Sequence, residues 1–247
     1  HSGAVPDSPT PHALSVVVPA FNEEASVRES LVRLLDVLDG CGRDFEVLLV
    51  SDGSTDRTVE QASTIDHPAL RIHEYAPNRG KGHALKAGIA MTSYPLVMFA
   101  DGDLDLDPSV IPGWLEVLDA DEADGVVGSK AHPDSQVEYP WTRHILSTVF
   151  KWLTRLLVGL DLGDTQTGMK IIRRDVLEDA ASETDTDGFA FDLELLVRLN
   201  DEGARIVEGP IILDFDFTSS VKVSAGWSAV RDLIRVSRWR RRVSRGA

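Results

Sequence analysis

The most constraining feature of this sequence is an alternation between short apolar runs and longer stretches with helical spacing. Four short runs predict strands: residues 14–19, 45–50, 70–75 and 96–100. Three stretches between them carry apolar side chains three or four positions apart, which predicts helices: residues 23–38, 55–65 and 80–91. Strands joined by helices need right-handed crossovers, so this pattern predicts an α/β fold with a mostly parallel sheet flanked by helices.

The second half of the chain is less regular. Residues 167–172 and 206–213 are predicted strands, and residues 191–200 are a predicted helix. Residues 141–160 form a long helical pattern rich in Trp, Phe and Leu, with interspersed Arg and Lys. Residues 1–13 are interpreted as the scar of a cleaved tag and a flexible proline-rich leader.

The charge distribution is asymmetric. The 247 residues carry a net charge of −15, but residues 222–247 hold eight basic residues and one acid, so the rest carries −22. An acidic body argues against nucleic acid as a partner, and the basic tail suits an anionic surface. The single cysteine, Cys41, excludes an internal disulfide and favours a reducing compartment.

An Asp-Gly-Asp motif follows the fourth predicted strand: Asp101, Gly102 and Asp103. Ligands of parallel α/β sheets bind outside the carboxyl ends of the strands. Two carboxylates one residue apart can hold a divalent cation that keeps positions open for phosphate oxygens. The simpler interpretation is an acidic surface loop, but the place after a buried strand favours a metal site.

Two more polar motifs follow predicted strands. In the segment 51–58, Ser54 or Thr55 is placed to cap the next helix. That role does not need Asp52, whose carboxylate could accept hydrogen bonds from a base or ribose. In the segment 78–83, two glycines at a helix start lie between cations, which is typical of an anion site or, more simply, of a solvated loop. Together the three motifs favour a nucleotide-diphosphate site with a metal.

Six segments of the chain resemble, in order, the inverting glycosyltransferases of family two: VVVPAFNEE, LLVSDGSTDRT, NRGKGHALKAGI, FADGDLD, DTQTGMKIIRRDV and FAFDLELL. The resemblance runs from about residue 15 to the tail and implies the Rossmann-like GT-A fold, with a catalytic domain over residues 14–221. More narrowly, the chain resembles the polyprenyl- or dolichyl-phosphate glycosyltransferases, and DTQTGMK is closer to their glucosyltransferase-like branch.

The resemblance implies a donor site. Glu23 would bind the nucleoside, Asp52 the base, and Lys81 would border the base or diphosphate. Asp101 and Asp103 would bind Mg²⁺ or Mn²⁺, with Asp101 on ribose or metal-bound water. The complete set implied for the nucleotide sugar is Pro19, Phe21, Glu23, Asp52, Lys81, Asp101, Gly102 and Gln166.

The resemblance also implies an acceptor site in which Lys130 and Arg143 hold the lipid phosphate. Lys130 stands where arginine is commoner, so a bidentate grip is lost there. The candidate catalytic residues are Asp103, Arg143 and Asp192, and Glu194 is expected near the reaction centre. Asp192 is a base, a positioning residue or simply a carboxylate stabilised by a helix dipole. A phosphate acceptor is already an anion and needs no strong base.

The resulting hypothesis is an inverting, metal-dependent transferase that moves a hexose from a UDP-glucose-like or GDP-mannose-like donor to polyprenyl or dolichyl phosphate. A soluble hydroxyl acceptor, such as a glycan or secondary metabolite, is the main alternative. An inactive nucleotide-sugar-binding module is a lesser one. A nucleotidyltransferase fits poorly, because its Gly-rich loop would replace residues 19–23 after the first strand.

Two segments have the composition of helices that lie at a bilayer surface: residues 141–160 and the basic amphipathic residues 226–243. Both can also be explained as ordinary core or surface helices. The sequence therefore predicts a cytoplasmic protein that docks peripherally on the cytoplasmic face of the membrane.

Overall fold

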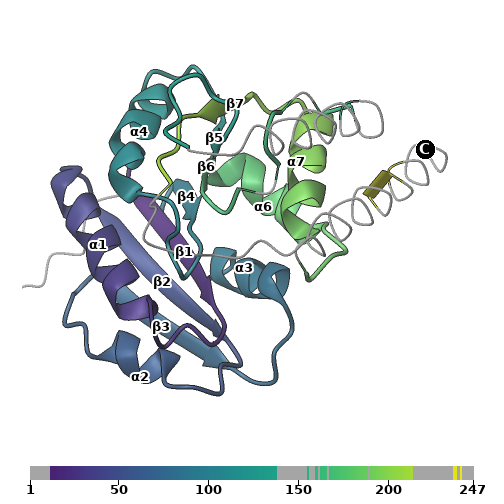
Figure 1. Cartoon of the computed structure of the whole chain (residues 1–247). Coiled ribbons are helices and arrows are strands. Elements are labelled where there is room, and N and C mark those ends of the chain that lie inside the picture. Colours follow the sequence, from purple (N-terminus) through teal and green to yellow (C-terminus); the bar gives the residue numbers. More distant parts are fainter. Residues whose placement is uncertain are drawn as a thin grey trace, which may run out of the picture.

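The computed structural model describes residues 12–137, 155, 159–160, 162–165, 167–188, 190–213, 236–237 and 240. They contain a seven-stranded sheet in the order β3-β2-β1-β4-β6-β5-β7 (Figure 1). The strands are β1 (Leu14–Ala20), β2 (Phe45–Asp52), β3 (Leu70–Tyr75), β4 (Leu96–Phe99), β5 (Gly125–Gly128), β6 (Lys170–Arg173) and β7 (Ile206–Gly209). The predicted mostly parallel sheet is confirmed; β6 is the exception, running antiparallel to β4 and β5.

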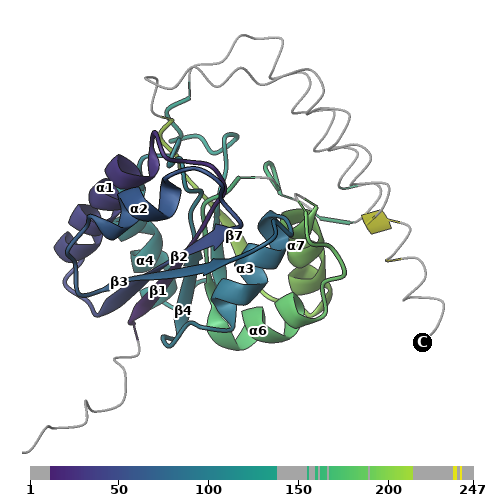
Figure 2. The same ribbon diagram turned by 90° about the horizontal axis from the view of Figure 1, so that it is seen from below.

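Helices cover both faces of the sheet, as Figure 2 shows edge-on. The described helices are α1 (Val27–Gly40), α2 (Thr58–Ser63), α3 (Lys81–Ile89), α4 (Ile111–Asp119), α6 (Arg174–Ser182) and α7 (Phe191–Asp201), with a short 3₁₀ turn η1 (Pro108–Val110). Alternate strand residues point to opposite faces. One set packs against α1 and α4, and the other against α3, α6 and α7.

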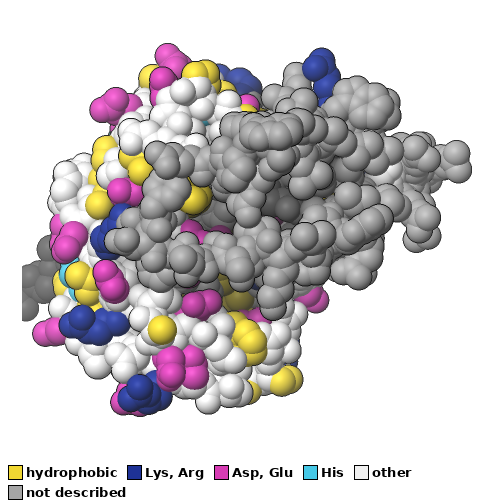
Figure 3. Space-filling view, in the orientation of Figure 1, with side chains coloured by type: hydrophobic (Ala, Val, Ile, Leu, Met, Phe, Trp, Pro, Cys, Tyr) yellow, Lys and Arg dark blue, Asp and Glu magenta, His cyan; other side chains and the backbone are white. Residues whose placement is uncertain are grey.

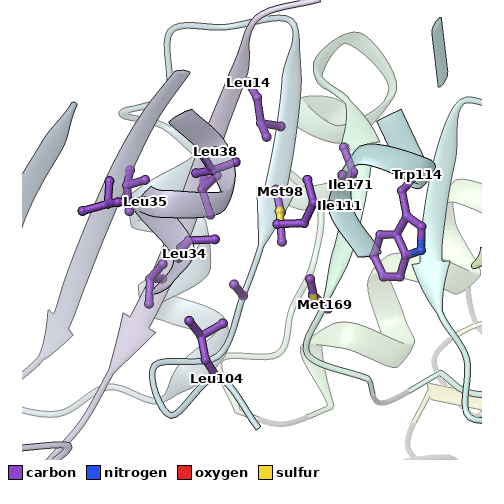
Figure 4. Close-up of a cluster of buried hydrophobic side chains, with 14 of the residues drawn as sticks. Leu14, Leu34, Leu35, Leu38, Met98, Leu104, Ile111, Trp114, Met169 and Ile171 are labelled. Carbon is purple, nitrogen blue, oxygen red and sulfur yellow. The ribbon is translucent and has the colours of Figure 1, made fainter. Parts of the chain in front are cut away.

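The face under α1 and α4 shows why these residues form these elements. Leu31, Leu34, Leu35 and Leu38 follow helical spacing and lie on the strands at no more than 3% exposure. Figure 4 shows the last three of them beside Leu14 and Met98, with Trp114 of α4 nearer β6. Burial of this stripe and of the strand side chains is the main force that holds α1 and α4 on the sheet.

The predicted helices are real but begin later than their periodicity suggests. Residues 53–57 and 21–26 form two loops that are joined by side-chain hydrogen bonds: Thr55 N–H donates to Asn22 Oδ1 at 2.8 Å, and Glu23 N–H donates to Thr58 Oγ1 at 2.8 Å. The prediction that Ser54 or Thr55 caps the second helix is wrong, because Asp56 Oδ1 accepts from Thr58 N–H at the start of α2. Both loops lie at the carboxyl ends of β1 and β2, and they form one edge of the site described below.

Several predictions fall outside the described residues. Arg143, Gln166, most of residues 141–160 and most of the tail belong to this group. Of the tail, Val236 is 2% exposed and packs in the core cluster with α7, and Arg240 pairs with Asp201. No helix within the part of the chain that the structure describes is both long and apolar enough to cross a bilayer.

Candidate active site

The candidate site lies at the carboxyl ends of β1, β2 and β4, where the three parallel strands end at one edge of the sheet. Pro19 is buried within β1. Phe21 follows β1 and is 45% exposed, the highest exposure of any large apolar side chain among the described residues. Gly102 approaches the carbonyl of Pro19 so closely that a Cβ at this position would lie 3.0 Å from the oxygen. Donor-site residues predicted on separate strands are therefore brought together.

Asp52 is engaged within the protein rather than directed into open space. It is 3% exposed, and its carboxylate accepts three hydrogen bonds, from Tyr75 Oη at 2.8 Å, Arg79 N–H at 2.7 Å and Gly80 N–H at 2.8 Å. Gly80 has a φ of +103°, which only glycine adopts without strain. The glycine-rich loop predicted to bind an external anion thus binds the carboxylate of Asp52, and the two motifs form one rigid unit.

Four carboxylates gather after β1 and β4: Glu23, Asp101, Asp103 and Asp105. Burial, followed by repulsion from Asp105, Asp101 and Glu23, raises the pKa of Asp103 to about 6. Burial and the nearby acids also raise the pKa values of Glu23 and Asp105. Such mutual repulsion is unfavourable without a cation. Figure 3, in the orientation of Figure 1, shows acidic side chains scattered over the described part of the surface in view.

The donor set suits a divalent cation that takes few protein ligands. No group of three or more metal-ligating side chains arranged around one point occurs among the residues that the structure describes. Mg²⁺ typically uses one or two carboxylates and completes its shell with water and substrate phosphates. Asp101 and Asp103 match that chemistry. Asp107 is excluded from it, because Asp107 Oδ1 accepts from Ser109 N–H at the start of η1 and its other oxygen pairs with Arg33.

A series of alternating charges leads inward from Asp101. Asp101 Oδ1 lies 2.5 Å from Lys81 Nζ, which lies 3.6 Å from Asp192 Oδ2. Asp192 Oδ1 in turn lies 2.5 Å from Lys170 Nζ. Burial alone would raise the pKa of Asp192, but Lys170 and Lys81 outweigh it and lower that pKa. Burial likewise opposes the charge of Lys81, yet Asp192 and Asp101 raise its pKa.

These contacts bear on the roles considered for Asp192. Both carboxylate oxygens contact lysines, and the lowered pKa makes the group a poor proton acceptor. The contacts of the described residues therefore fit a positioning role toward Lys81 better than proton abstraction.

Glu194 does not lie beside Lys81 and Lys170, as Asp192 does. Its carboxylate accepts from Asp185 N–H, Thr186 N–H and Thr186 Oγ1, and it pairs with Arg198. The expectation that it approaches the reaction centre is wrong, because the residue follows Asp192 by two positions and so points to another side of α7. It holds instead the loop whose Asp187 carbonyl accepts from His83 N–H at the start of α3.

Gly168, the last residue of the DTQTG segment, lies directly against Asp101. A Cβ on Gly168 would overlap the Asp101 carboxylate, so glycine is needed for this approach. Thr165 and Thr167 are 2–3% exposed, and their hydroxyl oxygens have no hydrogen-bond partner among the described residues. Lys130 Nζ lies 3.7 Å from Asp164 Oδ2 and is near enough to Asp105 to lower its pKa, against the larger effects of burial and Asp101.

Lys170 is the site residue that the sequence analysis did not single out. It is fully buried in β6, between Met169 and Ile171, and it also donates to the Thr167 carbonyl at 2.7 Å. A lysine inside an apolar strand is rare unless it is paired. A lysine within this apolar strand was therefore a signal in the sequence. Its partner could not be identified, because Asp192 on α7 lies 22 residues away along the chain.

The profile of the family described as "Glycosyl transferase family 2" matches residues 15–180. The chain is 29% identical over 211 residues to the polyprenol monophosphomannose synthase of Mycolicibacterium smegmatis, covering 82% of this chain and 77% of that protein. It is 33% identical over 213 residues to the dolichyl-phosphate beta-glucosyltransferase of Drosophila melanogaster, covering 77% and 63%. Two other curated relatives are longer, and the chain spans 35% and 49% of their lengths.

The fold matches a solved structure of glucosyl-3-phosphoglycerate synthase from Mycobacterium tuberculosis, in complex with Mn²⁺, uridine diphosphate and phosphoglyceric acid. The TM-score is 0.64 at 21% identity, over 91% of this chain and 78% of that one. This similarity confirms the predicted GT-A architecture. The matched profile and the ordered motifs around the site lead to one assignment: the chain belongs to glycosyl transferase family 2.

Proposed function

We propose that this protein transfers a hexose from a nucleotide diphosphate sugar to the phosphate of a polyprenyl or dolichyl phosphate, with inversion at the anomeric carbon. The observation that carries the proposal is the group of carboxylates after β4, tied through Lys81 to the buried Asp192. Curated relatives named as polyprenol and dolichyl-phosphate transferases support the acceptor class.

Mg²⁺ or Mn²⁺ is the proposed cofactor, held by Asp101 and Asp103. When bound, such an ion neutralises charge that develops on a departing diphosphate. The structural neighbour that contains Mn²⁺ and uridine diphosphate supports this class of ion. The raised pKa of Asp103, caused by burial and neighbouring acids, supports a site that is built to receive positive charge.

The residues of this chain divide the remaining work. Phe21 offers an exposed aromatic face for a base, next to Pro19 and Glu23. Asp52 fixes the backbone of residues 79–80 and so sets the start of α3 and Lys81. Lys81 carries positive charge beside Asp101, where it can meet a diphosphate. Gln166 and Gly102 are proposed next to the donor sugar and nucleotide.

The acceptor phosphate is proposed to bind Lys130 and Arg143. Lys130 has a 40% exposed side chain on the side of the site that carries Asp164 and Asp105. The proposed membrane contact through residues 141–160 and 226–243 would present a lipid phosphate from the cytoplasmic side. An anionic acceptor attacks without losing a proton, so the chemistry asks for cations and orientation more than for a base.

A soluble hydroxyl acceptor is the second candidate. The Mn²⁺-containing neighbour, which was solved in complex with phosphoglyceric acid, favours it. A hydroxyl needs a general base, however, and Asp192 is paired with two lysines and has a lowered pKa. This observation favours the phosphate acceptor. An inactive nucleotide-sugar-binding module remains the least favoured alternative.

Two variants separate these functions in transfer assays with nucleotide sugars, Mg²⁺ or Mn²⁺, and either polyprenyl phosphate or a panel of soluble acceptors. For the lipid phosphate we expect Arg143→Ala to reduce transfer strongly, while Asp192→Asn retains measurable turnover. For a hydroxyl acceptor the opposite order is expected. Metal-dependent nucleotide binding without transfer to any acceptor would favour the binding module.

A further inference from the structure

The charges leading inward from the site are supplied by four different elements. Asp101 follows β4, Lys81 begins α3, Asp192 lies in the first turn of α7, and Lys170 begins β6. Their side-chain exposures fall steadily from 40% for Asp101 to 16% for Lys81, 4% for Asp192 and 0% for Lys170. A buried charge is thus connected to the open site by direct contacts alone.

The position of Lys170 is costly for a residue that only fills the core. Taking an ammonium and a carboxylate out of water is expensive, and apolar pairs of similar volume often give equal or greater stability. Lys170 Nζ donates to Asp192 Oδ1 and to the Thr167 carbonyl, and it lies 5.9 Å from the centre of the Phe99 ring. These contacts fix its ammonium on three sides, which holds Asp192 in one orientation.

Asp192 without Lys170 would have a different preferred geometry. It now contacts Lys170 at 2.5 Å with one oxygen and Lys81 at 3.6 Å with the other, while Lys81 contacts Asp101 at 2.5 Å. Lys81 is therefore shared, and the closer of its two contacts is with Asp101. If Lys170 were neutral, Asp192 would have Lys81 as its only cation among these contacts, and the attraction between them would draw Lys81 inward.

We infer that Lys170 is a positioning residue for the donor site: it satisfies Asp192 and thereby leaves Lys81 directed at Asp101 and the nucleotide diphosphate. Lys170 touches neither substrate nor metal in this role. The inference rests on the proposed function for the identity of the ligand. It adds to that function a residue from β6, the strand that continues directly from the DTQTG segment.

The variants that test this are Lys170→Met and the double variant Lys170→Met/Asp192→Leu. Methionine and leucine keep apolar volume in the buried space, so we expect the double variant to unfold within a few degrees of the wild type. Lys86→Met is the control. Lys86 lies on α3, the helix that begins with Lys81, but it pairs with the carboxylate of Asp187 at 2.6 Å and takes no part in the contacts between Lys81, Asp192 and Lys170.

The first measurement is calorimetric binding of UDP and GDP in the presence of Mn²⁺. Outer groups that orient binding residues typically contribute about ten- to a hundredfold. We expect the better-bound nucleotide to lose about tenfold in affinity in Lys170→Met and to be unchanged in Lys86→Met. The double variant lacks the carboxylate that would draw Lys81 inward, so its affinity should return close to that of the wild type. Wild-type affinity in Lys170→Met, or a loss in the double variant as large as in Lys170→Met, would overturn the inference.

The second measurement is a crystal structure of each variant without ligands. We expect Lys81 Nζ to leave hydrogen-bonding distance of Asp101 in Lys170→Met and approach Asp192. An unmoved Lys81 in Lys170→Met would overturn the inference. The position of Lys81 does not depend on activity, so the proposed function and the role of Lys170 can fail separately. A wild-type protein that binds neither nucleotide refutes the proposed function. The position of Lys81 in Lys170→Met still tests the role of Lys170.

Discussion

Replacing Lys81 by methionine should tighten the binding of a divalent cation to the protein without nucleotide. Lys81 Nζ lies 2.5 Å from Asp101 Oδ1, where it neutralises a carboxylate that the metal would use. A cation entering this site must displace that ion pair and approach a positive charge. Lys81→Met removes both obstacles, and Asp192 keeps its other partner, Lys170, at 2.5 Å.

The expected gain in metal affinity depends on how exposed the Asp101–Lys81 ion pair is. The Asp101 side chain is 40% exposed and Lys81 is 16% exposed, so the pair is screened more than a buried one. We assign it about 1–2 kcal/mol, which corresponds to about a five- to thirtyfold gain in metal affinity. The affinity for a nucleotide diphosphate in the presence of metal should fall in Lys81→Met, because an ammonium beside the phosphates is lost.

The assay is a Mn²⁺ titration of the free protein followed by calorimetry or electron paramagnetic resonance, and then a UDP or GDP titration at saturating Mn²⁺. Lys86→Met serves as the control on the same helix. Unchanged or weaker Mn²⁺ affinity in Lys81→Met would refute the reasoning that Lys81 competes with the metal for Asp101.

Three further predictions concern stability and the approach of the DTQTG segment. Gly168→Ala should displace the Asp101 carboxylate and lower Mn²⁺-dependent nucleotide affinity at least about tenfold in calorimetry, since its Cβ would overlap that carboxylate; wild-type affinity would contradict the contact. Gly113 lies in α4, where an added Cβ would have no atom within 4 Å apart from its chain neighbours and the backbone of its own helix. Gly113→Ala should therefore raise the free energy of unfolding by about 0.5–1 kcal/mol in urea titrations, and a loss would show hidden crowding. Asp103→Asn should stabilise the metal-free protein by about 1–2 kcal/mol at about pH 8, after allowance for solvent screening. The pKa of Asp103 is about 6 in the folded protein and 3.8 ordinarily, so above about pH 6 the folded state must carry an ionised carboxylate that its surroundings disfavour. The gain should shrink toward about pH 4, where the carboxyl is largely protonated when folded; a gain that does not change with pH over this range would contradict the repulsion.

The strands were the most predictable part of the fold. Val16, Leu48 and Val97 belong to runs that are apolar because both faces of each strand are covered. β5 escaped prediction because its sequence, Gly-Val-Val-Gly, holds only two apolar side chains between glycines. The antiparallel direction of β6 depends on where the chain returns after a long connection, and no local spacing encodes it.

The site was predicted at the level of motifs but not of contacts. Asp101 and Lys81 lie together at the strand ends, as predicted. Binding of the glycine-rich loop by Asp52 was not predicted, because a sequence does not show which of two polar motifs supplies the anion for the other. Glu194 was expected beside Asp192, but residues two apart on a helix point to different sides.

Transfer of a labelled hexose tests the central claim most directly. Purified protein, Mg²⁺ or Mn²⁺ and polyprenyl phosphate would be incubated with UDP- and GDP-sugars, and the lipid fraction would be analysed for product and anomeric configuration. We predict a hexosyl phosphate lipid with inverted configuration, dependent on metal and lost in Asp103→Ala. Absence of lipid product from every common donor, or undiminished transfer by Asp103→Ala, would contradict the account.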